Sequence, residues 1–318
     1  MIRNRGLQLL LIPGILIAIL YSSYRMLQNS GSPGYRSVSV IVDNSTSDRW
    51  IAFREGLEQG ALEEQINISF VSTDVFKSTE EETAVIRKEL ENGADGLIVE
   101  PCGDDREGQL LEALPQPSSV LVVFSISSDP LMEAICADWH EMGSAAAETV
   151  SKEYPACRVG ILAGDLRLAD MDLCLGGARG FLQSSGVEIV WICSPADLPD
   201  EFSLEKKLME EPADVLLALD DSMTKLAADY ARGTHSEPPG IIGIGRSEQN
   251  IISVDEGWIS ALIVPDEYYM GYHCVKTLSQ KLGTYSAVKE TAPVPFVTVT
   301  KDNLYNEDTE TLLFPIRS

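Results

Sequence analysis

Residues 215–223 read Val-Leu-Leu-Ala-Leu-Asp-Asp-Ser-Met, and this stretch decides the fold class. Five apolar residues without alternation predict a short strand buried on both faces, because a strand with one wet face alternates apolar and polar residues. Asp220 and Asp221 mark a turn, and a helix is predicted from Ser222 to Arg232. A buried strand that leads directly into a helix is the repeating unit of a parallel α/β sheet.

The same alternation of strand and helix extends in both directions along the chain. It pauses after a short strand at Glu133–Ala137 and then restarts, which predicts an α/β fold of two Rossmann-like, doubly wound parallel-sheet lobes. The other predicted strands are Ser37–Val42, Ile66–Val71, Gly96–Val99, Val120–Phe124, Val159–Leu162, Glu188–Ile192, Gly240–Ile244 and Ala261–Val264. The other predicted helices include Glu80–Asn92, Glu107–Leu114, Glu141–Tyr154, Asp172–Ser185, Leu204–Glu210 and Asp266–Leu282.

Length and charge narrow the class of protein. A chain of 318 residues predicts about two domains at roughly 100–200 residues each. The 24 Lys and Arg residues against 49 Asp and Glu give a net charge of -25, which excludes nucleic-acid binding because that needs a basic surface. We interpret the acidity as keeping an exported domain soluble and away from anionic lipid; the alternative is a cationic ligand.

No cofactor, metal or catalytic group can be argued from motifs. No G-x-G-x-x-G follows a predicted strand, so a nucleotide cofactor is not indicated. The six cysteines form no C-x-x-C pair and have no histidine at metal-ligand spacing. Neither a Ser/His/Asp nor a paired-carboxylate arrangement follows from the spacing. The sequence therefore predicts a binding protein rather than an enzyme.

The N-terminus carries a membrane signal. Arg3 and Arg5 precede an apolar run from Leu7 to Tyr24, whose 18 residues would make a helix of roughly 27 Å, nearly the thickness of a bilayer core. No small-residue cleavage site precedes Arg25, so we favour an uncleaved anchor over a cleaved signal peptide. Either alternative places the body of the chain outside the cytoplasm, and the favoured anchor would hold it at the cell membrane.

A series of strand–turn signatures runs along the chain, and each of them alone is weak. They are Val38–Val42 with Trp50 and Gly56, Ala94–Val99, Ala137-Asp138 with Gly143, Gly176–Phe181, Ala218–Met223 and Pro265–Gly271. In the order of these signatures, the chain resembles the type I periplasmic binding proteins over roughly Ser37 to Asn303. These are the ribose- and galactose-binding group, whose fold also forms the sugar-binding domain of lactose-repressor-like regulators.

The resemblance implies where the lobes begin and end. Residues 1–36 would form the anchor and a linker, residues 37–137 and 266–284 the first lobe, and residues 138–265 and 285–318 the second. The chain departs from the family at four places where polar groups contact the sugar. Phe124-Ser125-Ile126, Leu175, Gly245-Arg246 and Pro265 stand at those places.

Two candidate ligand-binding residues follow the first strand. Trp50 matches a position where the family stacks an aromatic ring on the ligand, and an aromatic face suits the C–H surface of a sugar. The alternative is a core residue of the following helix. Arg49 beside it could hydrogen-bond the ligand or remain solvated.

Three further candidates follow later strands or a lobe crossing. Asp138 and Asp220 match positions that accept hydrogen bonds from sugar hydroxyls, and ionised carboxylates are pure acceptors. Both also precede helices, so the alternative role is helix capping. Arg246 could replace a lost ligand partner at the edge of the cleft, or lie on the surface. We expect Trp50, Asp138 and Asp220 to face one shared cleft.

The predicted function is reversible binding of a small sugar or another polar molecule by hinge closure of the two lobes. The expected partner is a membrane ABC permease or a sensor kinase. An alternative is a ligand-sensing regulator without a transport role, or one whose ligand binding has degenerated. A transcription regulator would need a basic helix-turn-helix where the membrane segment stands.

Overall fold

The structure is a computed structural model of the chain. It describes residues 36–46, 50–101, 120–123, 133–166, 168–200, 202–234, 237–283 and 293–313. The chain divides into a short unit, Met1–Arg36, and a large compact unit, Ser37–Ser318, which holds nearly all of the described residues. The predicted membrane segment Leu7–Tyr24 and the predicted helix Glu107–Leu114 lie outside the described residues. Within the described part, no helix is long and apolar enough to cross a membrane.

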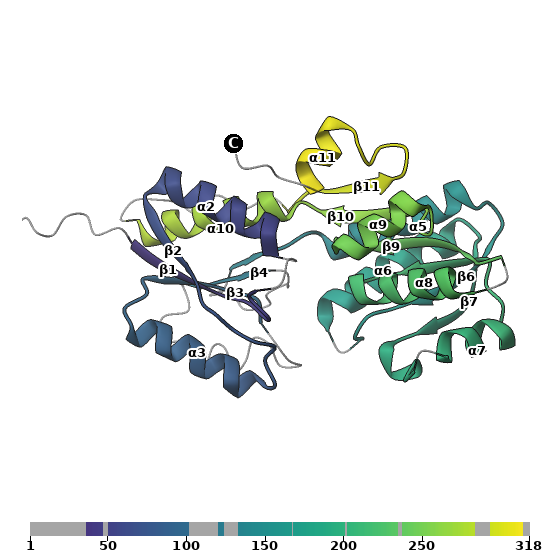
Figure 1. Cartoon of the computed structure of the whole chain (residues 1–318), viewed down its shortest axis with the longest axis horizontal. Coiled ribbons are helices and arrows are strands. Elements are labelled where there is room, and N and C mark those ends of the chain that lie inside the picture. Colours follow the sequence, from purple (N-terminus) through teal and green to yellow (C-terminus); the bar gives the residue numbers. More distant parts are fainter. Residues whose placement is uncertain are drawn as a thin grey trace, which may run out of the picture. The chain divides into compact units, whose positions relative to one another are not determined.

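In the described part of the chain, the first sheet contains five strands in the order β2-β1-β3-β4-β5. Figure 1 labels β1 to β4 of this sheet. Its pairings β1–β3, β3–β4 and β4–β5 are parallel. The strands are β1 (Arg36–Ile41), β2 (Ile66–Phe70), β3 (Gly96–Val99), β4 (Val120–Val123) and β5 (Glu133–Ile135). Val38 and Val40 of β1 join one core cluster and Ile41 joins another, so each face of the sheet is covered, as doubly wound sheets require.

Among the described residues, three helices cover this sheet. Helix α3 (Thr79–Glu91) packs on one face, and α2 (Ile51–Glu64) lies with α10 (Glu267–Leu282) on the other (Figure 1). Lys276 of α10 forms ion pairs of 2.8 Å with Glu63 and 2.7 Å with Glu64 of α2. Helix α10 therefore belongs to the layer of the first sheet, although it follows the strands of the second sheet in sequence.

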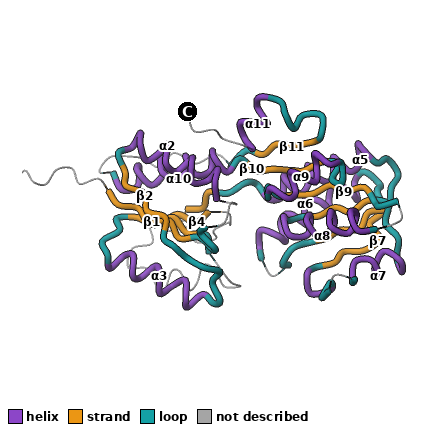
Figure 2. Tube along the Cα trace, in the orientation of Figure 1, coloured by secondary structure: helices purple, strands orange, loops and turns teal. Residues whose placement is uncertain are grey.

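In the described part of the chain, the second sheet contains six strands in the order β11-β10-β9-β8-β6-β7. Figure 2 draws its strands in orange and labels β7, β9, β10 and β11. Helices α5 (Trp139–Glu153) and α6 (Ala169–Ser184) cover one face, and α7 (Ser203–Glu210), α8 (Asp221–Gly233) and α9 (Glu248–Glu256) cover the other. A short helix, α11 (Glu307–Leu313), follows the last strand. The strands are β6 (Arg158–Leu162), β7 (Glu188–Cys193), β8 (Val215–Ala218), β9 (Gly240–Ile244), β10 (Ala261–Pro265) and β11 (Phe296–Thr300).

Two sheets with parallel strands confirm the predicted fold class, with one local difference. Strand β11 pairs antiparallel with β10 at the sheet edge, and the sequence analysis predicted neither β11 nor helices α9 and α11. Helix α9 buries Asn250 and Ser253 beside Ile251 and Val254, so its inner face is partly polar and gives a weak hydrophobic pattern. The predicted lobe boundaries remain predictions.

Helices α5 and α6 pack backbone against backbone. A Cβ atom on Gly143 would lie 2.0 Å from the carbonyl oxygen of Cys174, and one on Gly177 would lie 2.0 Å from the carbonyl oxygen of His140. Because real Cβ atoms do not approach so closely, only glycine permits this distance between the helices. Two glycines, one on each helix, therefore set the distance between α6 and α5, the helix that Asp138 caps.

Candidate functional site

Asp220 stands at the carboxyl end of β8, the edge where open α/β sheets bind ligands. Its Oδ1 accepts hydrogen bonds from the Met223 amide at 2.7 Å and the Ser222 hydroxyl at 2.8 Å, which caps α8. Its Oδ2 faces Gly164 after β6, where a Cβ would lie only 2.1 Å away. Among the described residues, Oδ2 receives no hydrogen bond. One oxygen of Asp220 is thus structural, and the other remains able to accept from a ligand.

The environment of Asp220 opposes its charge. Burial away from water raises the pKa of this carboxyl above its ordinary value of 3.8, and the hydrogen bond from Met223 offsets only part of that effect. A carboxyl whose pKa is higher in the folded than in the unfolded protein stabilises the fold at pH values below its pKa in the unfolded chain. This stabilisation is lost as the pH rises through the pKa of the folded protein. At neutral pH, the ionised Asp220 therefore costs the ligand-free protein stability.

We expect Asp220→Asn to raise the urea midpoint of the ligand-free protein at about pH 7, because the amide removes the buried charge and can still cap α8. The gain should shrink as the pH falls toward the ordinary aspartate pKa of 3.8. Urea unfolding at both pH values measures the difference. An equal or lower midpoint for the variant at neutral pH would contradict the description of this site.

Asp138 caps α5, and its Oδ1 accepts from the Glu141 amide at 2.9 Å. Its side chain is half-buried, directly after Ala137, which bridges to Val294. The structure therefore shows the capping role, while a contact from Asp138 to a ligand stays a prediction.

A third carboxylate, Asp170, connects Asp138 and Asp220. It lies in the first turn of α6, after β6, and is 8% exposed. Burial, and then the charges of Asp170 and Asp138, raise the pKa of Cys136 to about 11. Burial, and then the charges of Asp170 and Asp220, raise the pKa of Cys174 to about 12. Asp170 thus lies near both thiols, whereas Asp138 lies near Cys136 and Asp220 near Cys174.

The sequence analysis missed Asp170. Its signal was available, because the residue opens the helix that follows β6 and so lies at the same strand edge as Asp220.

Trp50 lies in the core of the first sheet's layer. It is 1% exposed, its Nε1 donates to the backbone oxygen of Asp43 at 3.0 Å, and its ring lies 5.9 Å from that of Phe53. These features are those of a core residue, which was the alternative role for Trp50. A stacking contact of Trp50 with a ligand stays a prediction. Arg49 lies outside the described residues.

Arg246 does not lie exposed on the surface, which was one of the two alternatives for this residue. Its side chain is 11% exposed, and its Nη1 pairs at 3.0 Å with Glu267, whose side chain is 6% exposed. Its Nη2 donates to the backbone oxygens of Leu312 at 3.3 Å and Leu313 at 3.0 Å. Both terminal nitrogens are therefore committed to this protein's own groups, and a contact from Arg246 to a ligand stays a prediction.

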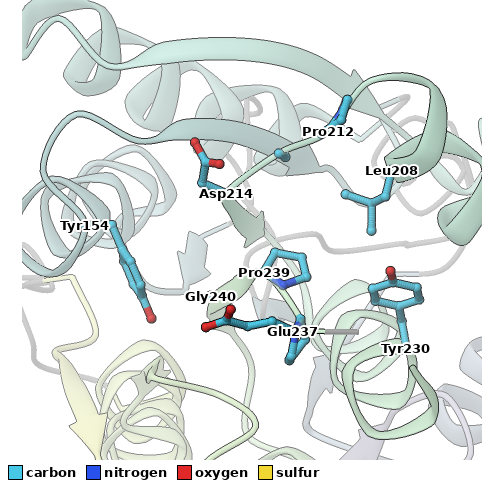
Figure 3. Close-up of a pocket in the computed structure, with 10 residues that line it drawn as sticks. Tyr154, Leu208, Pro212, Asp214, Tyr230, Glu237, Pro239 and Gly240 are labelled. Atoms are coloured by element: carbon cyan, nitrogen blue, oxygen red, sulfur yellow. The ribbon is translucent and has the colours of Figure 1, made fainter. Parts of the chain in front are cut away.

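A hollow of about 480 Å³ opens at the opposite end of the second sheet (Figure 3). It lies where β8 and β9 begin. Asp214, one of its lining acids, pairs with Arg158 at 3.4 Å. Tyrosine and proline side chains surround it, and none of the four predicted site residues that the structure describes lines it. The lining residues are Tyr154, Leu208, Pro212, Ala213, Asp214, Tyr230, Glu237, Pro238, Pro239 and Gly240.

Residues 38–284 match the model of a family described as the periplasmic binding protein domain. The chain belongs to this family. No curated protein matches the chain.

Solved structures share the fold at low sequence identity. The myo-inositol binding protein from Caulobacter, bound to myo-inositol, is 20% identical with a TM-score of 0.72, and the match covers 87% of this chain and 97% of that one. GanP, a glucose-galactose binding protein from Geobacillus stearothermophilus, is 18% identical with a TM-score of 0.73, and the match covers 85% of this chain and 99% of that one. A putative LacI transcriptional regulator from Bacteroides fragilis is 18% identical with a TM-score of 0.73, and the match covers 85% of this chain and 98% of that one. At these identities, the similarity shows the fold alone.

Proposed function

We propose that this periplasmic binding protein binds a small carbohydrate at the carboxyl-end edge of the second sheet. The observation that carries the proposal is Asp220, a desolvated carboxylate with one oxygen fixed by its own helix and the other without a hydrogen bond from the described residues. Holding a carboxylate in this state costs stability, and donors from a ligand would offset that cost. Sugar hydroxyls are donors of the required kind.

The similar structures support the choice of ligand class. They include proteins described as bound to myo-inositol, D-arabinose and D-allose. The family match covers the described parts of both sheets except β11, together with α10. Binding would close the two lobes about the segments that cross between the sheets. The ligand would favour the closed state because it makes more contacts there than in the open state.

Thermal unfolding of the full chain in detergent, with a sugar panel, tests this function. The panel contains myo-inositol, D-galactose, D-glucose, D-arabinose, D-allose and D-ribose. A sugar present at 100 times its Kd stabilises the native state by about 2.7 kcal/mol, which raises the unfolding temperature by several degrees. An unchanged unfolding temperature with every member at about 10 mM would exclude a site of useful affinity for these sugars.

The location and partner belong to the same proposal. The apolar run Leu7–Tyr24, with Arg3 and Arg5 before it, supports a membrane anchor with the body outside the cytoplasm. An anchored sugar-binding domain could deliver its ligand to an ABC permease or report it to a sensor kinase. Four expected polar contacts are replaced, at Ser125, Leu175, Gly245 and Pro265, and this favours sensing over high-affinity uptake.

We expect the protein to remain in the membrane fraction after a wash with about 1 M salt, because apolar insertion does not depend on charge. The measurement is an immunoblot of membrane and soluble fractions, with a variant lacking residues 1–24 as the control. A mature soluble protein that begins after Ser23 would show that the segment is only a signal peptide.

A further inference from the structure

Arg246 joins three segments that are distant in sequence. Its backbone follows β9, its Nη1 contacts Glu267 in the first turn of α10, and its Nη2 contacts carbonyl oxygens of Leu312 and Leu313 in α11. Its Nε is buried and has no hydrogen-bond partner among the described residues. A guanidinium fits such a junction because its fixed fork directs several donors in one plane.

The ion pair with Glu267 crosses from one sheet's layer to the other's. Arg246 follows β9 of the second sheet, whereas α10 is held to α2 of the first layer by Lys276. The chain passes between the layers just before Glu267, where the Asp266 amide donates to the Pro295 oxygen at 2.8 Å. Two crossing segments therefore run beside the ion pair.

The backbone of Arg246 is fastened to the turn that carries Asp220. Asp221 Oδ1 accepts from the amides of Arg246 at 2.7 Å and Ser247 at 2.8 Å. The Asp221 backbone oxygen accepts from Asn250 Nδ2 at 2.9 Å. The carboxylate of Asp220 is thus one peptide unit from the residue that holds the Arg246 backbone.

We propose that Arg246 is a positioning residue that fixes the Asp220–Asp221 turn to α10, and so couples the crossing between the two sheets to the carboxylate that would receive the ligand. Its relevance to the ligand rests on the proposed function, but the mechanical coupling does not. A rearrangement at the crossing would move Glu267, then Arg246, then the turn. The reverse path would let an occupied Asp220 act on α10.

Amide hydrogen exchange of the full chain in detergent, without ligand, tests this coupling. The variants are Arg246→Met and Glu267→Gln, and the second keeps the arginine and the shape of its partner. The reporters are the Met223 amide, bonded to Asp220 Oδ1, and the Ser247 amide, bonded to Asp221 Oδ1. The Ile161 amide in the buried β6 serves as the reference for global opening.

In both variants, we expect the Met223 and Ser247 amides to exchange about tenfold faster, beyond any change at Ile161. The matched control is Lys281→Met, which breaks another ion pair of α10, that with Glu133 at 3.1 Å, where the side chains are 13% and 21% exposed. This control should leave both reporters at the parent rate after the same correction. Arg246→Lys should recover part of the protection, because it restores the charge opposite Glu267.

Faster exchange confined to α10 and α11, with Met223 and Ser247 unchanged, would overturn the proposal and leave the ion pair as a local structural contact. Equal acceleration at Ile161 and at the reporters in both variants would also overturn it. Since no sugar is present, these outcomes are independent of the carbohydrate panel, so failure of the coupling and failure of the proposed function are distinguishable.

Discussion

Replacing Glu267 with leucine is expected to lower the free energy of unfolding by about 3–5 kcal/mol, because the change leaves the Arg246 guanidinium buried without its counter-charge. The two side chains are 11% and 6% exposed, so water cannot take the place of the lost partner. Arg246→Met should also lower the free energy of unfolding, because it removes the charge opposite Glu267 and the donors to Leu312 and Leu313. Urea unfolding monitored by circular dichroism measures both.

The double variant Arg246→Met with Glu267→Leu shows which of two causes lowers the stability of the single variants. One cause is the lost attraction between the two charges, and the other is the buried charge left without its partner. Replacing a buried pair by apolar side chains of similar size is often neutral, so the double variant should be more stable than either single variant. Losses that simply add, or single losses below about 1 kcal/mol, would show that water reaches the pair and that its burial is not the determining factor.

Replacing Gly143 with alanine is expected to lower the free energy of unfolding by about 1–3 kcal/mol or more, since the new methyl group would overlap a backbone atom of α6. The added Cβ would lie 2.0 Å from the Cys174 carbonyl oxygen, and a backbone atom cannot rotate away as a side chain can. Helices α5 and α6 would have to separate along their contact. The unfolding midpoint in urea, at constant m-value, reports the loss.

Gly180→Ala in α6 is the matched control. A Cβ at Gly180 would meet nothing within 4 Å, and the residue is exposed in the helix interior. Alanine there should raise the free energy of unfolding by about 0.5–1 kcal/mol, because it restricts the unfolded chain more than glycine does. Equal behaviour of the two variants would mean that the close contact between α5 and α6 does not limit stability.

The sequence predicts the fold well where the strands are short, apolar and followed by a helix. Residues 215–223 form β8, the Asp220 cap and the start of α8, as their pattern predicts. The prediction is poorer at the edge beyond β10. Strand β11 is mostly half-buried and α11 has only seven residues, so neither shows a strong periodic pattern of apolar residues.

The candidate site is less visible in the sequence than the fold. Strand ends locate Asp220, and Asp170 follows from the same rule. No local pattern could pair Arg246 with Glu267, because the two residues are brought together by the packing of separate segments. Trp50 shows another limit, since an aromatic residue after a strand fits both a ligand platform and a core position. The sequence does not distinguish these two positions, whereas the structure shows Trp50 1% exposed.

Isothermal titration calorimetry of three proteins tests the central claim most directly. The parent, Asp220→Ala and Asp214→Ala proteins are titrated with the panel sugar that gives the largest thermal shift. Asp220 and Asp214 stand near opposite ends of β8, and Asp214 lines the hollow of Figure 3. We predict that Asp220→Ala weakens binding by roughly tenfold or more, the loss of about 1.5–3 kcal/mol expected for a hydrogen bond to a charged group, while Asp214→Ala binds like the parent. Weakened binding in Asp214→Ala, with parent affinity in Asp220→Ala, would contradict the account and place the ligand in the hollow at the opposite end of the sheet.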